Sequence, residues 1–172
     1  MRMWAPCSEG GPGLADCAAL IRQTSTQPAV DLRRLLEWLF FNLYVGNNDS
    51  HAKNLSMLEA PGGGQTLAPF YDLMGTRIYP GLSREFAFSV GGEAAPGSMR
   101  REHLDRLADE LEMQAGYLRR IAGEVIGRVP RAVERAGEQL VPLLSSGART
   151  LVARLERFVV SNAEAMGRRI GR

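Results

Sequence analysis

The chain has 172 residues, 45% of them hydrophobic and 23% charged, which are ordinary values for one folded domain. Its formal net charge is only +2, so we expect no direct nucleic-acid binding from electrostatics alone. No apolar run is long enough for a membrane span and no signal-peptide core is evident, so we expect a cytoplasmic protein without a membrane partner.

The first half of the chain predicts a poorly fixed start followed by two helices. Residues 1–13 end in Glu-Gly-Gly-Pro-Gly, which predicts a poorly fixed N-terminal segment, and we expect one domain over 14–172. Apolar spacing predicts a short helix over 14–21 and a second over 28–43, with a proline in its first turn. The second helix is apolar around much of its circumference, which predicts burial at the centre of the domain.

A small β-hairpin is expected after the second helix. Two short apolar runs, 55–58 and 67–70, flank the turn sequence Pro-Gly-Gly-Gly at 61–64, which is typical of two strands joined by a flexible turn. Such a hairpin would bring Asp72, just past the second strand, back beside Asp49.

The rest of the chain is expected to be largely helical. Residues 84–90 predict one more extended segment, and Ser98 is a candidate N-cap for the helix that follows. Pro130 is expected to kink or divide a later helix. Apolar residues at helical spacing predict helices over 104–111, 118–133 and 151–166. The fold class is therefore mainly α with a small β-hairpin.

Several reactive or charged residues are expected to have no special role. Cys7 and Cys17 have no Cys or His neighbours at metal-ligand spacing, so we expect free thiols in a reducing compartment. The arginine pairs 119–120 and 168–169 could contact phosphate, but we expect solvated helix faces. We expect His103 to be exposed to solvent and inert.

The most informative segment is the polar run at 47–54, Asn-Asn-Asp-Ser-His-Ala-Lys-Asn, which follows the apolar second helix. Asp49 and Asn54 have the D-x-x-x-x-N spacing of a kinase catalytic loop, and Asp72 follows in Phe-Tyr-Asp-Leu. This order and spacing indicate phosphoryl transfer.

Phosphoryl transfer requires a carboxylate near the accepting hydroxyl and cations near the transferred group. We expect Asp49 to be the catalytic base, and Asn54 and Asp72 to be oxygen ligands of the Mg²⁺ that accompanies ATP. Lys53 or His51 would contact the moving phosphoryl oxygens. Lys53 is the only lysine beside twenty arginines, which indicates a site that requires a compact point charge.

Two alternatives belong to other classes. Asp and Asn are common in turns, so the loop could be a structural remnant in a non-catalytic interaction module, whose helical half binds an antitoxin or a sibling subunit. A metallohydrolase is the second alternative, with His51 and Asp72 as ligands. The chain has only two histidines, which disfavours a site with several His ligands.

The sequence Gly-Asn-Asn-Asp-Ser-His-Ala-Lys-Asn-Leu-Ser at 46–56, with Ala-Pro-Phe-Tyr-Asp-Leu at 68–73, resembles the catalytic region of HipA-type serine/threonine kinases. The resemblance implies a protein-kinase-like C-terminal lobe. It matches Asp49 to the catalytic aspartate, Asn54 and Asp72 to the magnesium ligands, and His51 and Lys53 to the rest of the loop signature. It also implies a toxin of a bacterial toxin–antitoxin pair, with a DNA-binding antitoxin as partner and a translation-related protein as substrate.

The chain departs from that family pattern before Asp49. It has no G-x-G-x-x-G or G-x-x-x-x-G-K-[ST] motif there, and no lysine other than Lys53 to grip nucleotide phosphates. We therefore expect the C-terminal lobe only, from a truncated gene product, a mis-started reading frame or a split system with a separate N-terminal lobe. We also expect that this chain alone neither binds ATP tightly nor turns over.

Overall fold

The computed structural model describes residues 11–59 and 62–171. The described part of the chain contains five α-helices and one two-stranded sheet, which confirms the mainly helical fold with a small hairpin. The helices are α1 (Leu14–Thr24), α2 (Pro28–Val45), α3 (Arg101–Glu110), α4 (Ala115–Leu140) and α5 (Ser146–Ile170). The strands are β1 (Met57–Glu59) and β2 (Gln65–Leu67), and single 3₁₀ turns occupy Ala52–Asn54, Thr76–Ile78 and Val141–Leu143.

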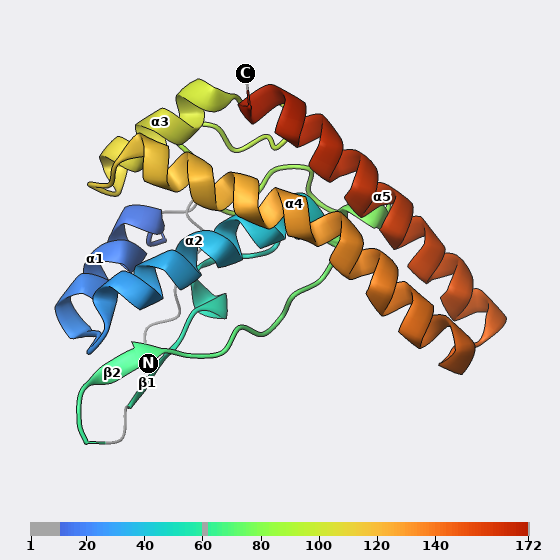
Figure 1. Ribbon diagram of the computed structural model, residues 1–172, viewed down its shortest axis with the longest axis horizontal. Coiled ribbons are helices and arrows are strands. Elements are labelled where there is room, and N and C mark those ends of the chain that lie inside the picture. Colours follow the sequence, from blue (N-terminus) through green and yellow to red (C-terminus); the bar gives the residue numbers. More distant parts are fainter. Residues whose placement is uncertain (1–10, 60–61, 172) are drawn as a thin grey trace.

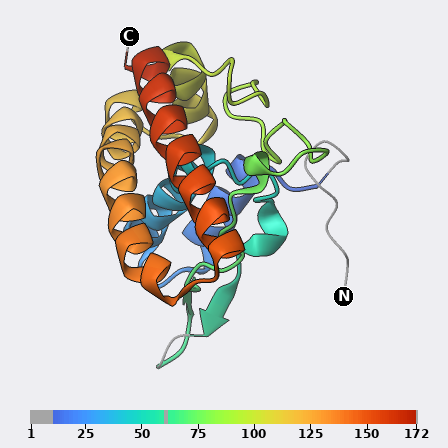
Figure 2. The same ribbon diagram turned by 90° about the vertical axis from the view of Figure 1, so that its right-hand side faces the viewer.

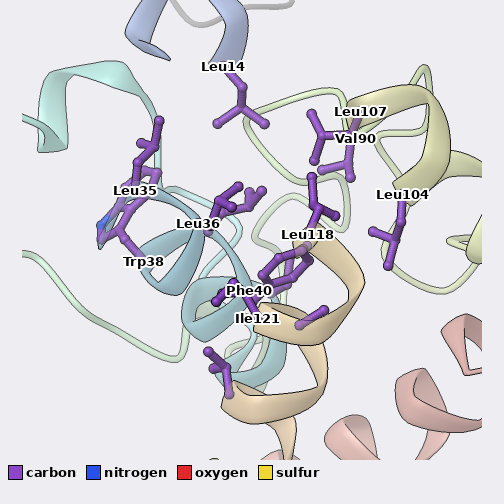
Figure 3. Close-up of a cluster of buried hydrophobic side chains, with 14 of the residues drawn as sticks. Leu14, Leu35, Leu36, Trp38, Phe40, Val90, Leu104, Leu107, Leu118 and Ile121 are labelled. Atoms are coloured by element: carbon purple, nitrogen blue, oxygen red, sulfur yellow. The ribbon is translucent and has the colours of Figure 1, made fainter. Parts of the chain in front are cut away.

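Helix α2 lies at the centre, as its sequence predicts. Pro28 opens it, where a missing N–H costs no hydrogen bond, and its apolar residues are buried on several sides. Figure 3 shows Leu36 and Phe40 of α2 against Leu118 and Ile121 of α4. Because α2 is enclosed by other elements, the loop that follows it starts from a fixed point.

Helices α4 and α5 form an antiparallel pair joined through Val141–Leu143 (Figure 1). Viewed from the side, α5 lies between α4 and the irregular chain that connects β2 to α3 (Figure 2). Pro130 lies inside α4 without dividing it, so the predicted division does not occur. Among the described helices, none combines the length and the apolar character that a bilayer span needs.

Helix α5 also forms hydrogen bonds to the C-terminal end of α2. The Asn162 side-chain amide donates hydrogen bonds to the carbonyl oxygens of Leu43 and Tyr44, both at 2.9 Å. These carbonyls belong to the last turn of α2, where the helix itself supplies no partner. A residue more than a hundred positions away therefore completes the C-terminus of the central helix.

The hairpin forms as predicted, but its strands lie closer to the turn. Strands β1 and β2 pair antiparallel, with Met57 opposite Leu67, whereas the sequence predicts strands at 55–58 and 67–70. Leu55 is instead the C-cap of a 3₁₀ turn. At the other end, Arg34 of α2 donates to the carbonyls of Leu67 and Ala68, at 2.6 and 3.0 Å, where β2 ends.

Two predictions before α3 are wrong. Residues 84–90 form no regular strand. Val90 makes only an isolated bridge with Glu93, while the Phe86 N–H donates to Ala94 and the Ala87 N–H donates to Asn48. Ser98 is not the helix cap either. Helix α3 starts after Arg100, whose N–H donates to His103 Nδ1 at 3.0 Å.

His103 is consequently a structural residue and not an exposed, inert one, since its side chain is only 12% exposed.

Cys7 lies outside the described residues. Cys17 packs half-buried against the core, and its state as a thiol stays a prediction. The poorly fixed segment predicted over 1–13 lies mostly outside the described residues, although Gly13 is the N-cap of α1 and its N–H donates to Asp16 Oδ2 at 2.8 Å.

Candidate functional site

The polar loop begins where Gly46 ends α2. Gly46 has φ = 73°, a left-handed conformation that side chains with a Cβ rarely adopt. A Cβ at this position would lie 2.4 Å from Cε1 of Phe158 on α5. Glycine is therefore required both by the backbone turn and by the close approach of α5.

Buried amide and hydroxyl groups hold the inner side of the loop. Asn47 Nδ2 donates to Asn42 Oδ1 at 2.8 Å and to the Asp72 carbonyl at 3.0 Å. Ser50 Oγ donates to the Asn47 carbonyl at 3.0 Å. The exposed fractions of Asn47 and Ser50 are 1% and 0%, so these side chains brace the backbone and are closed to a substrate.

Thr76 fastens the loop to the chain that follows the hairpin. Its Oγ1 accepts a hydrogen bond from the Asn48 N–H at 2.8 Å and donates to the Gly46 carbonyl at 3.1 Å. The Asn48 side chain donates to the Ser83 carbonyl at 3.0 Å. These bonds connect residues about thirty positions apart, so the loop and the segment after β2 form one unit.

Asn54, which is buried, and Asp72, which is exposed, are in direct contact. Asn54 Nδ2 donates to Asp72 Oδ2 at 3.0 Å, while Asn47 binds the Asp72 carbonyl. Asp72 has φ = 56°, and Asp is one of the few residues with a Cβ that tolerate this left-handed region. The two predicted magnesium ligands, eighteen residues apart in sequence, are thus neighbours in space.

The predicted catalytic groups line the outer side of the loop. The side chain of Asp49 is 69% exposed, and its Oδ1 lies 3.9 Å from His51 Nε2. Lys53 is exposed, and its carbonyl accepts from the Tyr71 hydroxyl at 2.8 Å. His51 is 22% exposed, and within the described part of the chain its buried Nδ1 has no hydrogen-bond partner. Asp49 and Lys53 are therefore accessible from solvent, and His51 is partly so.

Asn54 and Asp72 carry side-chain oxygens of the kind that bind magnesium. The hydrogen bond between Asn54 and Asp72 uses Nδ2 and Oδ2, so the amide Oδ1 and the carboxylate Oδ1 take no part in it. Such oxygens are the hard donors that Mg²⁺ prefers, whereas zinc prefers nitrogen and sulfur. Within residues 11–59 and 62–171, no group of three or more His, Cys, Asp and Glu side chains could hold a metal ion.

Sequence reasoning missed a second buried support of the site. Asp31 is fully buried in α2 and its Oδ2 accepts from the Leu67 N–H at 2.8 Å, while its Oδ1 lies 3.1 Å from Arg34. Arg34 in turn binds the last carbonyls of the hairpin and lies over the Phe70 ring. The available signal was an acidic and a basic residue three positions apart in a helix that is mostly apolar.

Known proteins are similar to this chain in both sequence and fold. The sequence model of the HipA-like C-terminal domain family matches residues 5–133. A Sinorhizobium fredii protein named "Putative kinase Y4mE" is 37% identical over 142 residues, 83% of this chain and 34% of the relative. The serine/threonine-protein kinase toxin HipA of Shewanella oneidensis is 29% identical over 139 residues, 77% of this chain and 32% of that protein.

One solved structure with a similar fold is a complex of HipA, HipB and operator DNA from Shewanella oneidensis. The HipA match has a TM-score of 0.82 at 24% identity and covers 94% of this chain and 36% of the other. The chain spans about a third of the length of the curated relatives it matches. The match of the family model over most of the chain, together with relatives that are named kinases, shows that this chain belongs to the HipA-like C-terminal domain family and is related to kinases.

Proposed function

We propose that this chain supplies the catalytic loop and the magnesium site of a serine/threonine protein kinase that transfers a phosphoryl group from Mg-ATP to a protein hydroxyl. The observation that carries the proposal is the contact between Asn54 Nδ2 and Asp72 Oδ2 at 3.0 Å. It joins the end of the D-x-x-x-x-N motif to the later aspartate, which is the pairing that a kinase uses to hold magnesium.

The roles of the residues follow from their exposure and chemistry. Asp49 accepts the proton of the serine or threonine hydroxyl as the hydroxyl oxygen bonds to the γ-phosphorus. The bond between that phosphorus and the bridging oxygen breaks, and ADP leaves with the electron pair. Lys53 and His51 stabilise the charge on the transferred group. Asn54 and Asp72 hold Mg²⁺, which neutralises phosphate charge when it is bound.

A phosphate-covering loop and a lysine on the nucleotide phosphates are also needed, and we propose that an N-terminal lobe not contained in residues 1–172 provides them. By analogy with the HipA and HipB complex, we propose a DNA-binding antitoxin as partner. A translation-related protein is the proposed substrate. On this proposal the chain alone gives no micromolar binding of ATP with magnesium in calorimetry, and incorporates no phosphate.

The magnesium site can be tested on this chain without any activity. Mn²⁺ replaces Mg²⁺ at oxygen sites and broadens nearby NMR signals. We expect Mn²⁺ to broaden the side-chain amide signals of Asn54 first, and this effect to disappear in Asp72→Asn. Asp109→Asn, an exposed change of equal charge on α3, is the matched control and keeps the effect. Broadening centred elsewhere, or unchanged in Asp72→Asn, would remove the support for the proposal.

A further inference from the structure

Arginines gather where α3 begins and α5 ends. Arg100, Arg168 and Arg169 line a surface hollow of about 330 Å³ together with Ala165. Figure 1 shows the C-terminal end of α5 beside α3, and the two helices are in contact. Arg100 is also the N-cap residue of α3, so the positive end of a ten-residue helix adds to the charge of the hollow.

Arg169 is held in place with part of its guanidinium group unpaired. Its Nη2 donates to the Pro96 carbonyl at 3.3 Å. Its Nε is buried and has no hydrogen-bond partner in the described part of the chain. The sequence predicts a solvated helix face for this residue. That prediction is wrong, because the Arg169 side chain is partly buried and contacts the segment before α3.

Like charges surround this arginine. Burial lowers the pKa of Arg169, and the nearby charges of Arg100 and Arg168 lower it further. The pKa of Arg77 is lowered in the same way, first by burial and then by Arg84 and Arg169. The cluster therefore extends from the hollow to the 3₁₀ turn after the polar loop.

The charges of this cluster are poorly compensated compared with those elsewhere in the molecule. Arg168 has a partner in Glu164 at 3.9 Å, but both side chains are more than 60% exposed, and such pairs contribute little. In contrast, Arg33 meets both Glu37 and Glu124 at 3.1 and 2.7 Å. Of the three arginines at the hollow, Arg169 is the partly buried one, and a cation whose buried Nε lacks a partner in the described residues is unfavourable in the absence of an anion.

We propose that this hollow is a binding site for a phosphate group, formed by Arg100, Arg168 and Arg169. Each guanidinium group presents several N–H donors in a fixed fork, which suits the oxygens of a phosphate dianion. Three such groups match the double charge and the three terminal oxygens of a phosphate monoester better than the single charge of a carboxylate. The phosphate can be a free anion or belong to a phosphorylated serine side chain, since both present the same oxygens.

Titrations with inorganic phosphate and with phosphoserine test the site on the intact chain, followed by NMR at ionic strength matched with chloride. We expect saturable shifts of the signals of Arg100, Arg168 and Arg169. Arg168→Gln is expected to weaken binding about tenfold. The exposed Arg135→Gln, near the other end of the α4–α5 pair, removes the same charge and should leave binding unchanged.

Arg169→Lys separates charge from geometry, because lysine keeps the charge and lacks the fork. We expect weaker binding with an unfolding midpoint in urea close to that of the wild type. If Arg135→Gln weakens binding as much as Arg168→Gln, or if phosphate shifts no signals beyond chloride, the proposal is wrong. Tighter binding of phosphoserine than of inorganic phosphate would assign the site to a phosphorylated side chain, and the reverse order would assign it to the free anion.

Discussion

The inner and outer sides of the polar loop differ in what their polar residues do. On the inner side, Asn47, Asn48 and Ser50 are at most 5% exposed, and each makes hydrogen bonds within the protein. On the outer side, Asp49 and Lys53 are exposed. One run of eight residues therefore combines a buried frame with an accessible charged edge.

This difference shows that a polar residue in a motif need not take part in catalysis or ligand binding. The frame should contribute mainly to the stability of the fold, because unsatisfied buried polar groups are costly. The exposed edge should contribute little to stability and mainly to catalysis. Substitutions on the two sides should therefore separate stability from activity.

The largest expected effect comes from Gly46→Ala in the frame. The new Cβ would be strained at φ = 73° and would lie 2.4 Å from the Phe158 ring, so we expect the free energy of unfolding to fall by about 3 kcal/mol. Urea denaturation measures this. Gly123→Ala is the control, because Gly123 lies in α4 with open space around it, and it should raise stability by about 0.5 kcal/mol. Equal effects at both positions would contradict the strained turn.

Thr76→Val should produce the next largest effect. Valine keeps the shape but leaves the buried Asn48 N–H and the Gly46 carbonyl without the Thr76 hydroxyl, so we expect a loss of about 2 kcal/mol. The measurement is again the free energy of unfolding. Thr150→Val removes an exposed hydroxyl that donates to the Ser146 carbonyl within its own helix and should change stability by less than about 0.5 kcal/mol. A loss below that limit for Thr76→Val would show that this hydroxyl does not fasten the loop.

Tyr44→Phe should alter the pH dependence of stability. Burial raises the pKa of Tyr44 well above its usual range, and its hydroxyl donates to the Ala122 carbonyl at 3.1 Å. Above about pH 10 the unfolded chain loses the tyrosine proton while the folded chain keeps it, so this stabilisation is present below pH 10 and declines above it.

The decline should be at most about 1.4 kcal/mol per pH unit in the wild type relative to Tyr44→Phe. Urea denaturation from pH 8 to 11 measures the difference between the two proteins. Tyr79→Phe, at a residue that is 46% exposed, should leave the wild-type pH dependence unchanged. Parallel curves for the wild type and Tyr44→Phe would contradict the prediction.

Asp49→Asn on the exposed edge should have the smallest effect on stability, within about 0.5 kcal/mol. In an assembly that also supplies the ATP-covering lobe, phosphoryl transfer should fall by about a hundredfold or more, because the carboxylate that accepts the proton is lost. Phosphate incorporation into a protein substrate measures the second effect. Unchanged transfer would favour the non-catalytic interaction module, and a large loss of stability would place Asp49 in the frame.

The sequence was sufficient for the features that depend on local patterns. The apolar periodicity of α2, the Pro-Gly-rich turn and the flanking apolar runs predict the helix, the loop and the hairpin. The hairpin in turn predicts that Asp72 returns beside Asp49. The structure shows Asp72 in contact with Asn54 of the same loop, and the approach to Asp49 itself stays a prediction.

Features that depend on distant partners could not be predicted. Strand β2 ends where Arg34 of α2 binds the carbonyls of Leu67 and Ala68, and no local pattern indicates that contact. Ser98 has the better N-cap propensity, yet the helix starts after Arg100, with His103 accepting the N–H of that residue. The partial enclosure of Arg169 also depends on Pro96, seventy-three positions earlier.

The contact of α5 with the end of α2 has a consequence for how this family can vary. The family model ends at residue 133, but Asn162 and Phe158, which hold the last turn of α2 and limit Gly46, lie beyond it. The conformation of the motif therefore depends on side chains of α5 that lie outside the matched region. A homologue could retain every signature residue and still lose the geometry of its loop through a change in this last helix, so the motif alone is an incomplete guide to which members are active.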